Sequence, residues 1–90
     1  MKLELKHQKR PKRAKDDAYT FYDVVGDDQE TLRSNRTYIE EKAREYLGRW
    51  FVSLKMNPRA SALTLTALKG ASAQAPDFAG FKRWVTTTDF

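Results

Sequence analysis

The 90-residue chain contains no cysteine and carries a net charge of +5, so we expect one small core without support from disulfide bonds or thiolate-bound metals. It lacks both the apolar run of a secretory signal peptide and the ~20 apolar residues of a membrane span. These absences predict an intracellular, cytoplasmic protein without a membrane partner.

The basic residues are concentrated near the N-terminus. Residues 1–15 contain seven basic side chains and one acidic side chain, a net charge of +6, whereas residues 16–90 contain ten basic and eleven acidic ones. Leu3 and Leu5 alternate with charged residues, as in a strand at a sheet edge, but Pro11 and the density of charge favour disorder. We therefore expect a disordered basic arm, residues 1–17, followed by a single domain, residues 18–90.

Residues 18–25 predict a strand, because aromatic and β-branched residues follow one another until a turn begins at Gly26. Tyr19 and Phe21 lie on one face of such a strand, and Tyr22 lies on the other. One face belongs to the core, and the other is either covered by a helix or open to a partner.

The next segment has the periodicity of a helix. Its apolar stripe consists of Leu32, Ile39, Ala43, Tyr46, Leu47 and Trp50. Two capping boxes compete for the start: Asp27 with Glu30 begins the helix near residue 28, and Thr37 with Glu40 begins it near residue 38. Gly48 favours an end at that point, because glycine is costly inside a helix.

Residues 49–69 predict a β-hairpin. Trp50, Val52, Leu54 and Met56 alternate with Phe51, Ser53 and Lys55, as in a half-buried strand, although a helix continuing to Leu54 is an alternative. In the strand, Phe51 points to the face opposite Trp50, which makes it a candidate for an exposed contact.

The second half of this region allows two interpretations. The alternation of apolar residues with Thr64 and Thr66 predicts a strand over residues 62–68. Asn57 as an N-cap, Pro58 in the first turn and Gly70 after the end would instead suit a helix. We favour the strand, because threonine suits a pleated surface better than a helix, and this places the turn at residues 57–60.

The last segment predicts a short amphipathic helix after a linker of small residues, 71–76. Phe78, Phe81, Trp84 and Val85 share one helical face, and residues 86–90 are expected to fray. The resulting β-α-β-β-α order indicates a small α+β domain, with a three-stranded antiparallel sheet packed by one or two helices. We expect the most buried residues to be Ile39, Tyr46, Leu47, Trp50, Phe81 and Trp84.

The sequence offers little for catalysis. The single histidine, His7, lies in the basic arm, and no cluster of histidines or spaced acidic loop supplies metal ligands. Asp27 and Asp28 suit the start of a helix better than a cation site. No glycine-rich phosphate loop is present. We therefore expect no enzymatic activity, no cofactor and no metal.

The basic arm predicts a function, because flexible Lys and Arg side chains neutralise phosphates without a folded site. Two basic–aromatic clusters, around Trp50 and Trp84, would suit stacking with single-stranded nucleic acid, although both tryptophans are expected in the core. The candidate contacts are Lys6, Lys9, Arg10, Lys12, Arg13, Lys15, Arg49, Phe51, Lys82 and Arg83. They predict an accessory protein that binds the phosphate backbone of DNA or RNA, mainly through the arm.

A second class of function is a protein-binding modulator or inhibitor, of the kind that phages and mobile elements encode. Such a protein would dock on a host protein, or on a second copy of itself, through the aromatic face of the strand at residues 18–25. The basic arm is necessary for the first function and dispensable for the second.

Overall fold

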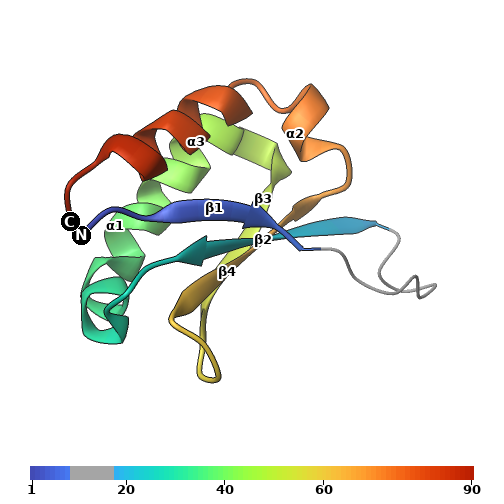
Figure 1. The fold of residues 1–90 in the computed structure, drawn as a ribbon. Coiled ribbons are helices and arrows are strands. Elements are labelled where there is room, and N and C mark those ends of the chain that lie inside the picture. The colour runs from blue at the N-terminus through green and yellow to red at the C-terminus, as the bar shows by residue number, and fades with distance from the viewer. Residues whose placement is uncertain (9–17) are drawn as a thin grey trace.

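A four-stranded antiparallel sheet forms one layer of the protein, and the helices form the other (Figure 1). The computed structural model describes residues 1–8 and 18–90. The strands are β1 (Glu4–His7), β2 (Tyr19–Val25), β3 (Phe51–Asn57) and β4 (Ala62–Leu68), arranged in the order β1-β2-β4-β3. The helices are α1 (Gln29–Leu47), α2 (Ala71–Gln74) and α3 (Phe78–Thr87). The α+β class is therefore confirmed.

The sheet has a fourth strand that the sequence analysis assigned to a disordered arm. In β1, Leu5 pairs with Val24 and His7 pairs with Tyr22 of β2. Leu3, just before β1, is only 2% exposed. The prediction of disorder is wrong for residues 1–8, because two alternating leucines bury enough apolar surface to outweigh the charge beside them. Residues 9–17 of the predicted arm lie outside the described residues.

Helix α1 begins at the earlier of the two predicted starts. Its N-cap is Asp28 rather than Asp27, and the Asp28 carboxylate accepts hydrogen bonds from the backbone N–H of Glu30 and the hydroxyl of Thr31. The helix ends as predicted at Gly48, whose φ of 56° suits glycine alone.

Strand β3 forms the predicted hairpin with β4, but its alternation is displaced. A 3₁₀ turn over Gly48–Trp50 leads into the strand, and a bulge shifts the register between Phe51 and Ser53. The bulge turns Phe51 into the core, at 9% exposure, and leaves Val52 at 42%. The predictions of an exposed Phe51 and a core-facing Val52 are therefore wrong.

The C-terminal region is more ordered than expected. The predicted linker contains the short helix α2, and α3 continues to Thr87, two residues beyond the predicted end. Phe90 does not fray: its backbone N–H donates to the carbonyl oxygen of Met1 at 3.0 Å, so both described ends lie side by side (Figure 1).

The core lies between the sheet and the helices. Of the six expected core residues, Ile39, Leu47 and Phe81 have no exposed surface. The other three are only partly buried and pack against the edge of this core; they are Tyr46, Trp50 and Trp84. Within residues 1–8 and 18–90, no helix is both long and apolar enough to cross a membrane.

Candidate nucleic-acid interface

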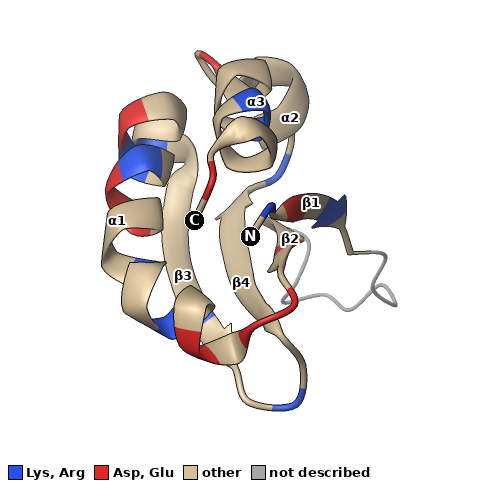
Figure 2. Ribbon diagram, turned by 60° about the vertical axis from the view of Figure 1, so that its left-hand side comes forward, with Lys and Arg blue, Asp and Glu red and all other residues tan. Residues whose placement is uncertain are grey.

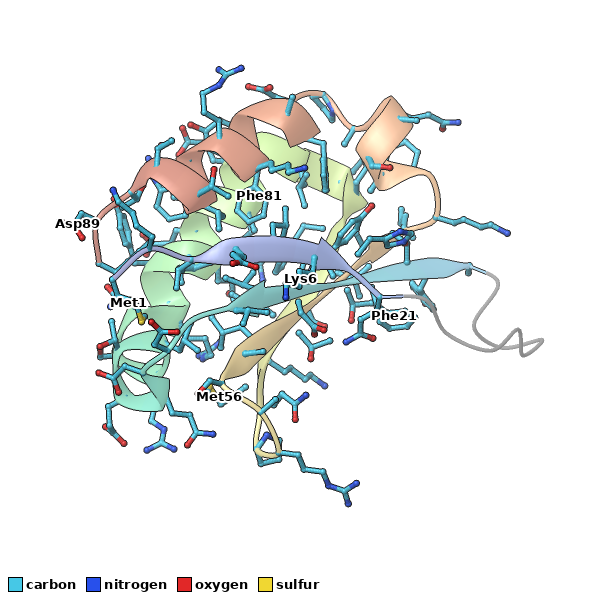
Figure 3. All side chains as sticks on the ribbon, viewed as in Figure 1. Met1, Lys6, Phe21, Met56, Phe81 and Asp89 are labelled. Carbon is cyan, nitrogen blue, oxygen red and sulfur yellow. The ribbon has the colours of Figure 1, made fainter. Side chains whose placement is uncertain are left out.

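All three helices pack on the same face of the sheet and leave the other face without a helical cover in the described part of the chain. The buried side chains of β2 and β4, such as Tyr22, Val24 and Leu65, join Ile39 of α1 and Phe81 of α3 in one core. The alternate positions point the opposite way, and Figure 3 shows Phe21 on the side of the sheet that faces away from Phe81. We call this surface the open sheet face; its residues are Glu4, Lys6, Tyr19, Phe21, Asp23, Val25, Ser53, Lys55, Asn57, Ala62, Thr64, Thr66 and Leu68.

Strand pairing arranges these side chains in rows across the sheet. Phe21 lies opposite Thr66, which in turn lies opposite Ser53. Tyr19 and Leu68 form the next row toward one end. Tyr19 is 40% exposed, one of three large apolar or aromatic side chains so exposed in the described part of the chain. The open sheet face therefore carries an exposed aromatic ring beside a row of hydroxyl groups.

A second row places charges across the sheet. Lys6 lies opposite Asp23, Asp23 opposite Thr64, and Thr64 opposite Lys55. The Asp23 carboxylate accepts a hydrogen bond from Gln8 Nε2 at 2.6 Å. Lys55 is exposed, and within residues 1–8 and 18–90 no carboxylate forms an ion pair with it. A cation thus stands on the open sheet face without a described counter-ion.

The chain enters and leaves the basic segment, defined as residues 9–17, at the Tyr19 end of the sheet (Figure 1). On the entering side, the backbone N–H of Gln8 donates to the carbonyl of Phe21 at 2.9 Å. On the leaving side, the backbone N–H of Lys69 donates to the carbonyl of Ala18 at 3.0 Å. Five candidate phosphate contacts lie in this segment, outside the described residues: Lys9, Arg10, Lys12, Arg13 and Lys15.

The remaining candidates do not form one site. Lys6 lies on the open sheet face and is exposed. Lys82 and Arg83 are exposed on α3, in the helix layer on the other side of the sheet. Arg49 is exposed, and its guanidinium carbon lies 5.7 Å from the centre of the Trp50 ring.

Phe51 is excluded as an exposed stacking contact. Its ring is buried under the guanidinium group of Arg44, whose Cζ lies 4.8 Å from the ring centre. Tyr19, which the sequence analysis placed on one face of its strand without choosing the exposed side, is the exposed aromatic residue on the open sheet face. The alternation of residues 18–25 predicted that Tyr19 and Tyr22 lie on opposite faces of the strand. Only the packing of the helices on the sheet shows which of these faces is covered.

Charges on α1 compensate one another. Figure 2 shows basic and acidic residues intermixed along this helix. Ion pairs of 2.8–3.4 Å join Arg33 to Glu30, Arg36 and Arg44 to Glu40, and Lys42 to Glu45. Helix α1 therefore presents little uncompensated positive charge.

Hydrogen bonds explain why the pKa values of two carboxylates, Asp28 and Asp89, are lowered. Hydrogen bonds from the side chain of Thr31 and the backbone of Glu30 hold the pKa of Asp28 below its ordinary value. A hydrogen bond from the α-amino group of Met1, together with its charge, lowers the pKa of Asp89. Among residues 1–8 and 18–90, no group of three or more His, Cys, Asp or Glu side chains is placed to hold a metal ion.

Comparison of the chain with protein-family models, with curated proteins and with solved structures gave no match. Function is therefore inferred from the residues of this chain alone.

Proposed function

We propose that the protein is a non-catalytic accessory protein that binds the phosphate backbone of DNA or RNA through the basic segment. The observation that carries this proposal is the distribution of charge. Five of the seven residues at positions 9–15 are Lys or Arg and none is acidic, whereas residues 18–90 contain ten basic and nine acidic side chains.

Binding of this kind needs no preformed pocket. Each phosphate that a Lys or Arg side chain neutralises releases condensed counterions into solution, and the gain in entropy drives association. The residues that flank the basic segment, Gln8 and Ala18, are both hydrogen-bonded to the sheet at the end where Tyr19 lies. On the open sheet face, Lys6 pairs with Glu4 at 3.4 Å, whereas Lys55 adds a cation that no described carboxylate neutralises.

The measurement that tests the proposal is the salt dependence of binding. With three to five phosphates contacted, the slope of log K against log salt concentration on duplex DNA should be about −3 to −5, because each contact contributes about −0.9. Binding should differ little between unrelated sequences, because phosphate contacts position a protein without reading bases.

The chain provides a matched pair of variants. Lys12→Gln/Arg13→Gln and Lys82→Gln/Arg83→Gln both neutralise an adjacent Lys-Arg pair, the first in the basic segment and the second on α3. The first should reduce the magnitude of the slope by about 2, and the second by less than half as much. Equal effects of the two variants, or no binding by the full chain at low salt, would overturn the proposal.

The aromatic content of the open sheet face supports the protein-binding function as the second candidate. Tyr19 and Phe21 share this face with Leu68, an arrangement that also suits a protein partner or a second copy of the chain. A full-length protein that ignores nucleic acid at low salt, yet forms dimers that Tyr19→Ala disrupts, would support this candidate.

A further inference from the structure

We propose that two copies of the chain pair antiparallel through the outer edge of β1, about a two-fold axis at Leu5, and so join their four-stranded sheets into one continuous sheet. This inference does not rest on the proposed function. It assigns a partner, a second copy of the chain, to a sheet edge rather than to the open sheet face.

The outer edge of β1 presents backbone hydrogen-bonding groups. β1 is the last strand of the sheet on its side, and Figure 2 shows no described helix or strand beyond it. The backbone N–H of Gln8 points to β2, where it donates to the carbonyl of Phe21 at 2.9 Å. Because these groups alternate in direction along an antiparallel strand, Leu5 and His7 direct theirs outward. Within residues 1–8 and 18–90, no hydrogen bond occupies these outward groups, so they can pair with a further strand.

The opposite edge of the sheet, on β3, is protected against such pairing. Arg36 of α1 donates from Nη1 to the carbonyl oxygen of Leu54 at 3.4 Å and so occupies an outward group of this strand. The bulge between Phe51 and Ser53 interrupts the regular spacing, and Lys55 places a charge on the strand. Side-chain cover, bulges and lysines are common means by which edge strands avoid association. The β1 edge, in contrast, has a regular register with β2.

Charge makes the β1 edge complementary to itself. Glu4 and Lys6 lie on either side of Leu5 in the strand, and both are exposed. In an antiparallel pair centred on Leu5, Glu4 of each copy lies directly opposite Lys6 of the other. These are non-hydrogen-bonded pairs with Cα atoms about 4.5 Å apart, so their side chains meet. The 3.4 Å contact between Glu4 and Lys6 within one chain is exposed, so its exchange for contacts between chains costs little.

Charge also disfavours the neighbouring registers. Centring the pair on Glu4 or on Lys6 would place that residue opposite its own copy, with two like charges at the closest approach. Centring it on His7 would place Lys6 opposite the neutral Gln8, so no ion pair would form. Of these registers, the one centred on Leu5 alone pairs opposite charges.

The C-terminal residue limits the pairing at one end. The carbonyl oxygen of Met1 accepts from the backbone N–H of Phe90 at 3.0 Å, and the α-amino group of Met1 donates to the carbonyl oxygen of Phe90 at 2.6 Å. A pair centred on Leu3 would need this place for Leu5 of the second copy. Phe90 therefore excludes that register and restricts the new ladder to residues 3–7.

Such a dimer is closed and weak. The two-fold axis uses the β1 edge of both copies and leaves a protected β3 edge at each end of the joined sheet, so assembly stops at two chains. Five residues from each chain bury much less surface than a stable interface needs, so we expect association at high protein concentration.

The first test is sedimentation equilibrium of the full chain at concentrations up to about 1 mM, which detects weak dimers. Wild type should form dimers as the concentration rises. Glu4→Lys and Lys6→Glu should each weaken dimerisation about tenfold or more, because each sets like charges opposite one another. An equimolar mixture of the two variants should dimerise again, because opposite charges then meet across the interface. Failure of the mixture to dimerise would overturn the inference.

The mixture separates contacts between chains from contacts within one chain. Both variants lose the Glu4–Lys6 contact of the single chain, and neither regains it on mixing. A recovery of dimers therefore reports pairing of β1 with β1 of the other variant.

Glu41→Lys and Lys55→Glu provide matched controls. They change the net charge as the β1 variants do, from +5 to +7 and to +3, but at exposed positions on α1 and β3. Each should dimerise within about threefold of wild type at physiological salt, where long-range repulsion is screened. A loss of dimers equal to that in the β1 variants would overturn the inference, because net charge would then explain it.

Amide hydrogen exchange tests the backbone pairing without any substitution. In the monomer, the outward N–H groups of Leu5 and His7 should exchange rapidly, whereas that of Lys6, directed to β2, should be protected. Raising the protein concentration should slow exchange at Leu5 and His7 and leave Lys6 nearly unchanged. Dimers that form without this protection would overturn the inference.

The outcomes are distinct from those of the proposed function. A chain that stays monomeric at every concentration would overturn the pairing of β1 and leave the phosphate contacts untouched. Dimers that Tyr19→Ala disrupts and Glu4→Lys leaves intact would also overturn it, and would support docking through the open sheet face instead.

Discussion

Phe81 is the largest side chain without exposed surface, and it lies where both long helices meet the sheet. Its ring centre is 6.2 Å from that of Tyr46 and 6.3 Å from that of Trp84. Trp84, by contrast, is only partly buried and contacts Tyr38 and Phe90 near the surface. Phe81 and Trp84 therefore differ in the space that their removal would leave.

Phe81→Ala should lower the free energy of unfolding by about 3–5 kcal/mol, because it creates a closed cavity. Trp84→Ala should have a smaller effect, because neighbouring side chains and water can fill the space. Urea denaturation of the two variants checks this order. A larger loss of unfolding free energy for Trp84→Ala would show that the contacts of Trp84 with Tyr38 and Phe90, rather than the interior, hold α3 in place.

The N-cap carboxylate of α1 should make stability depend on pH. The pKa of Asp28 is lowered in the folded protein by its hydrogen bonds, so its contribution is present above the ordinary value near 3.9 and is lost as the pH falls through the lower folded value. Asp28→Asn keeps a capping oxygen but cannot titrate. The variant should therefore show a smaller drop in melting temperature than wild type between pH 5 and pH 2, measured by circular dichroism. An identical drop would contradict this assignment.

At the residue level, the sequence allowed correct prediction of Ile39 and Leu47 as core, because both lie on a helical stripe whose period is constant. Phe51 and Val52 could not be assigned, since a bulge adds a residue to the strand and exchanges the two faces. The same limit applied to the candidate site. Tyr19 was recognised as part of an aromatic strand, but its exposure depends on which face the helices cover.

At the level of elements, β1 shows how a short strand depends on very few side chains. It contains four residues, and its attachment to the core rests on Leu3 and Leu5. The helix α1 and the β3–β4 hairpin were predictable because periodicity, caps and a turn agree in each. For β1, the charge of the following residues favoured disorder, whereas the alternation of Leu3 and Leu5 favoured a strand. The pairing with β2, which the sequence does not show, decides in favour of the strand.

Leu3→Ala should destabilise the protein by about 2–5 kcal/mol, as expected for a buried leucine. Its control is Glu4→Ala, one residue away on the exposed face, which should change stability by less than about 0.5 kcal/mol. Hydrogen exchange should show faster exchange of the β1 amides in Leu3→Ala than in Glu4→Ala. Equal exchange in the two variants would mean that β1 stays attached through its backbone alone.

At the scale of the whole molecule, the described core and the proposed binding charges occupy different residues. Five of the seven residues at positions 9–15 are Lys or Arg and the other two are Pro and Ala, so this segment offers few apolar side chains to a core. Binding and folding should therefore respond to different substitutions.

Replacing Lys9, Arg10, Lys12, Arg13 and Lys15 together by Gln lowers the net charge from +5 to 0. The melting temperature should stay within about 4 °C of wild type, the change that ~1 kcal/mol gives in a domain of this size. Solubility near pH 7 should fall, because mutual repulsion between molecules is lost. Differential scanning fluorimetry and light scattering measure the two properties. A much larger fall in melting temperature would show that the basic segment contributes to folding.

The short strand β1 also protects the protein from self-assembly. It covers the outer edge of β2, whose sequence YTFYDVV is rich in aromatic and β-branched residues and carries a single charge. If β1 detaches, this edge exposes unpaired N–H and C=O groups that can pair with the same strand of another molecule. The four residues of β1 thus cover an edge that could otherwise serve as a template for cross-β growth, and a firmer attachment of β1 should lower the tendency of the chain to aggregate.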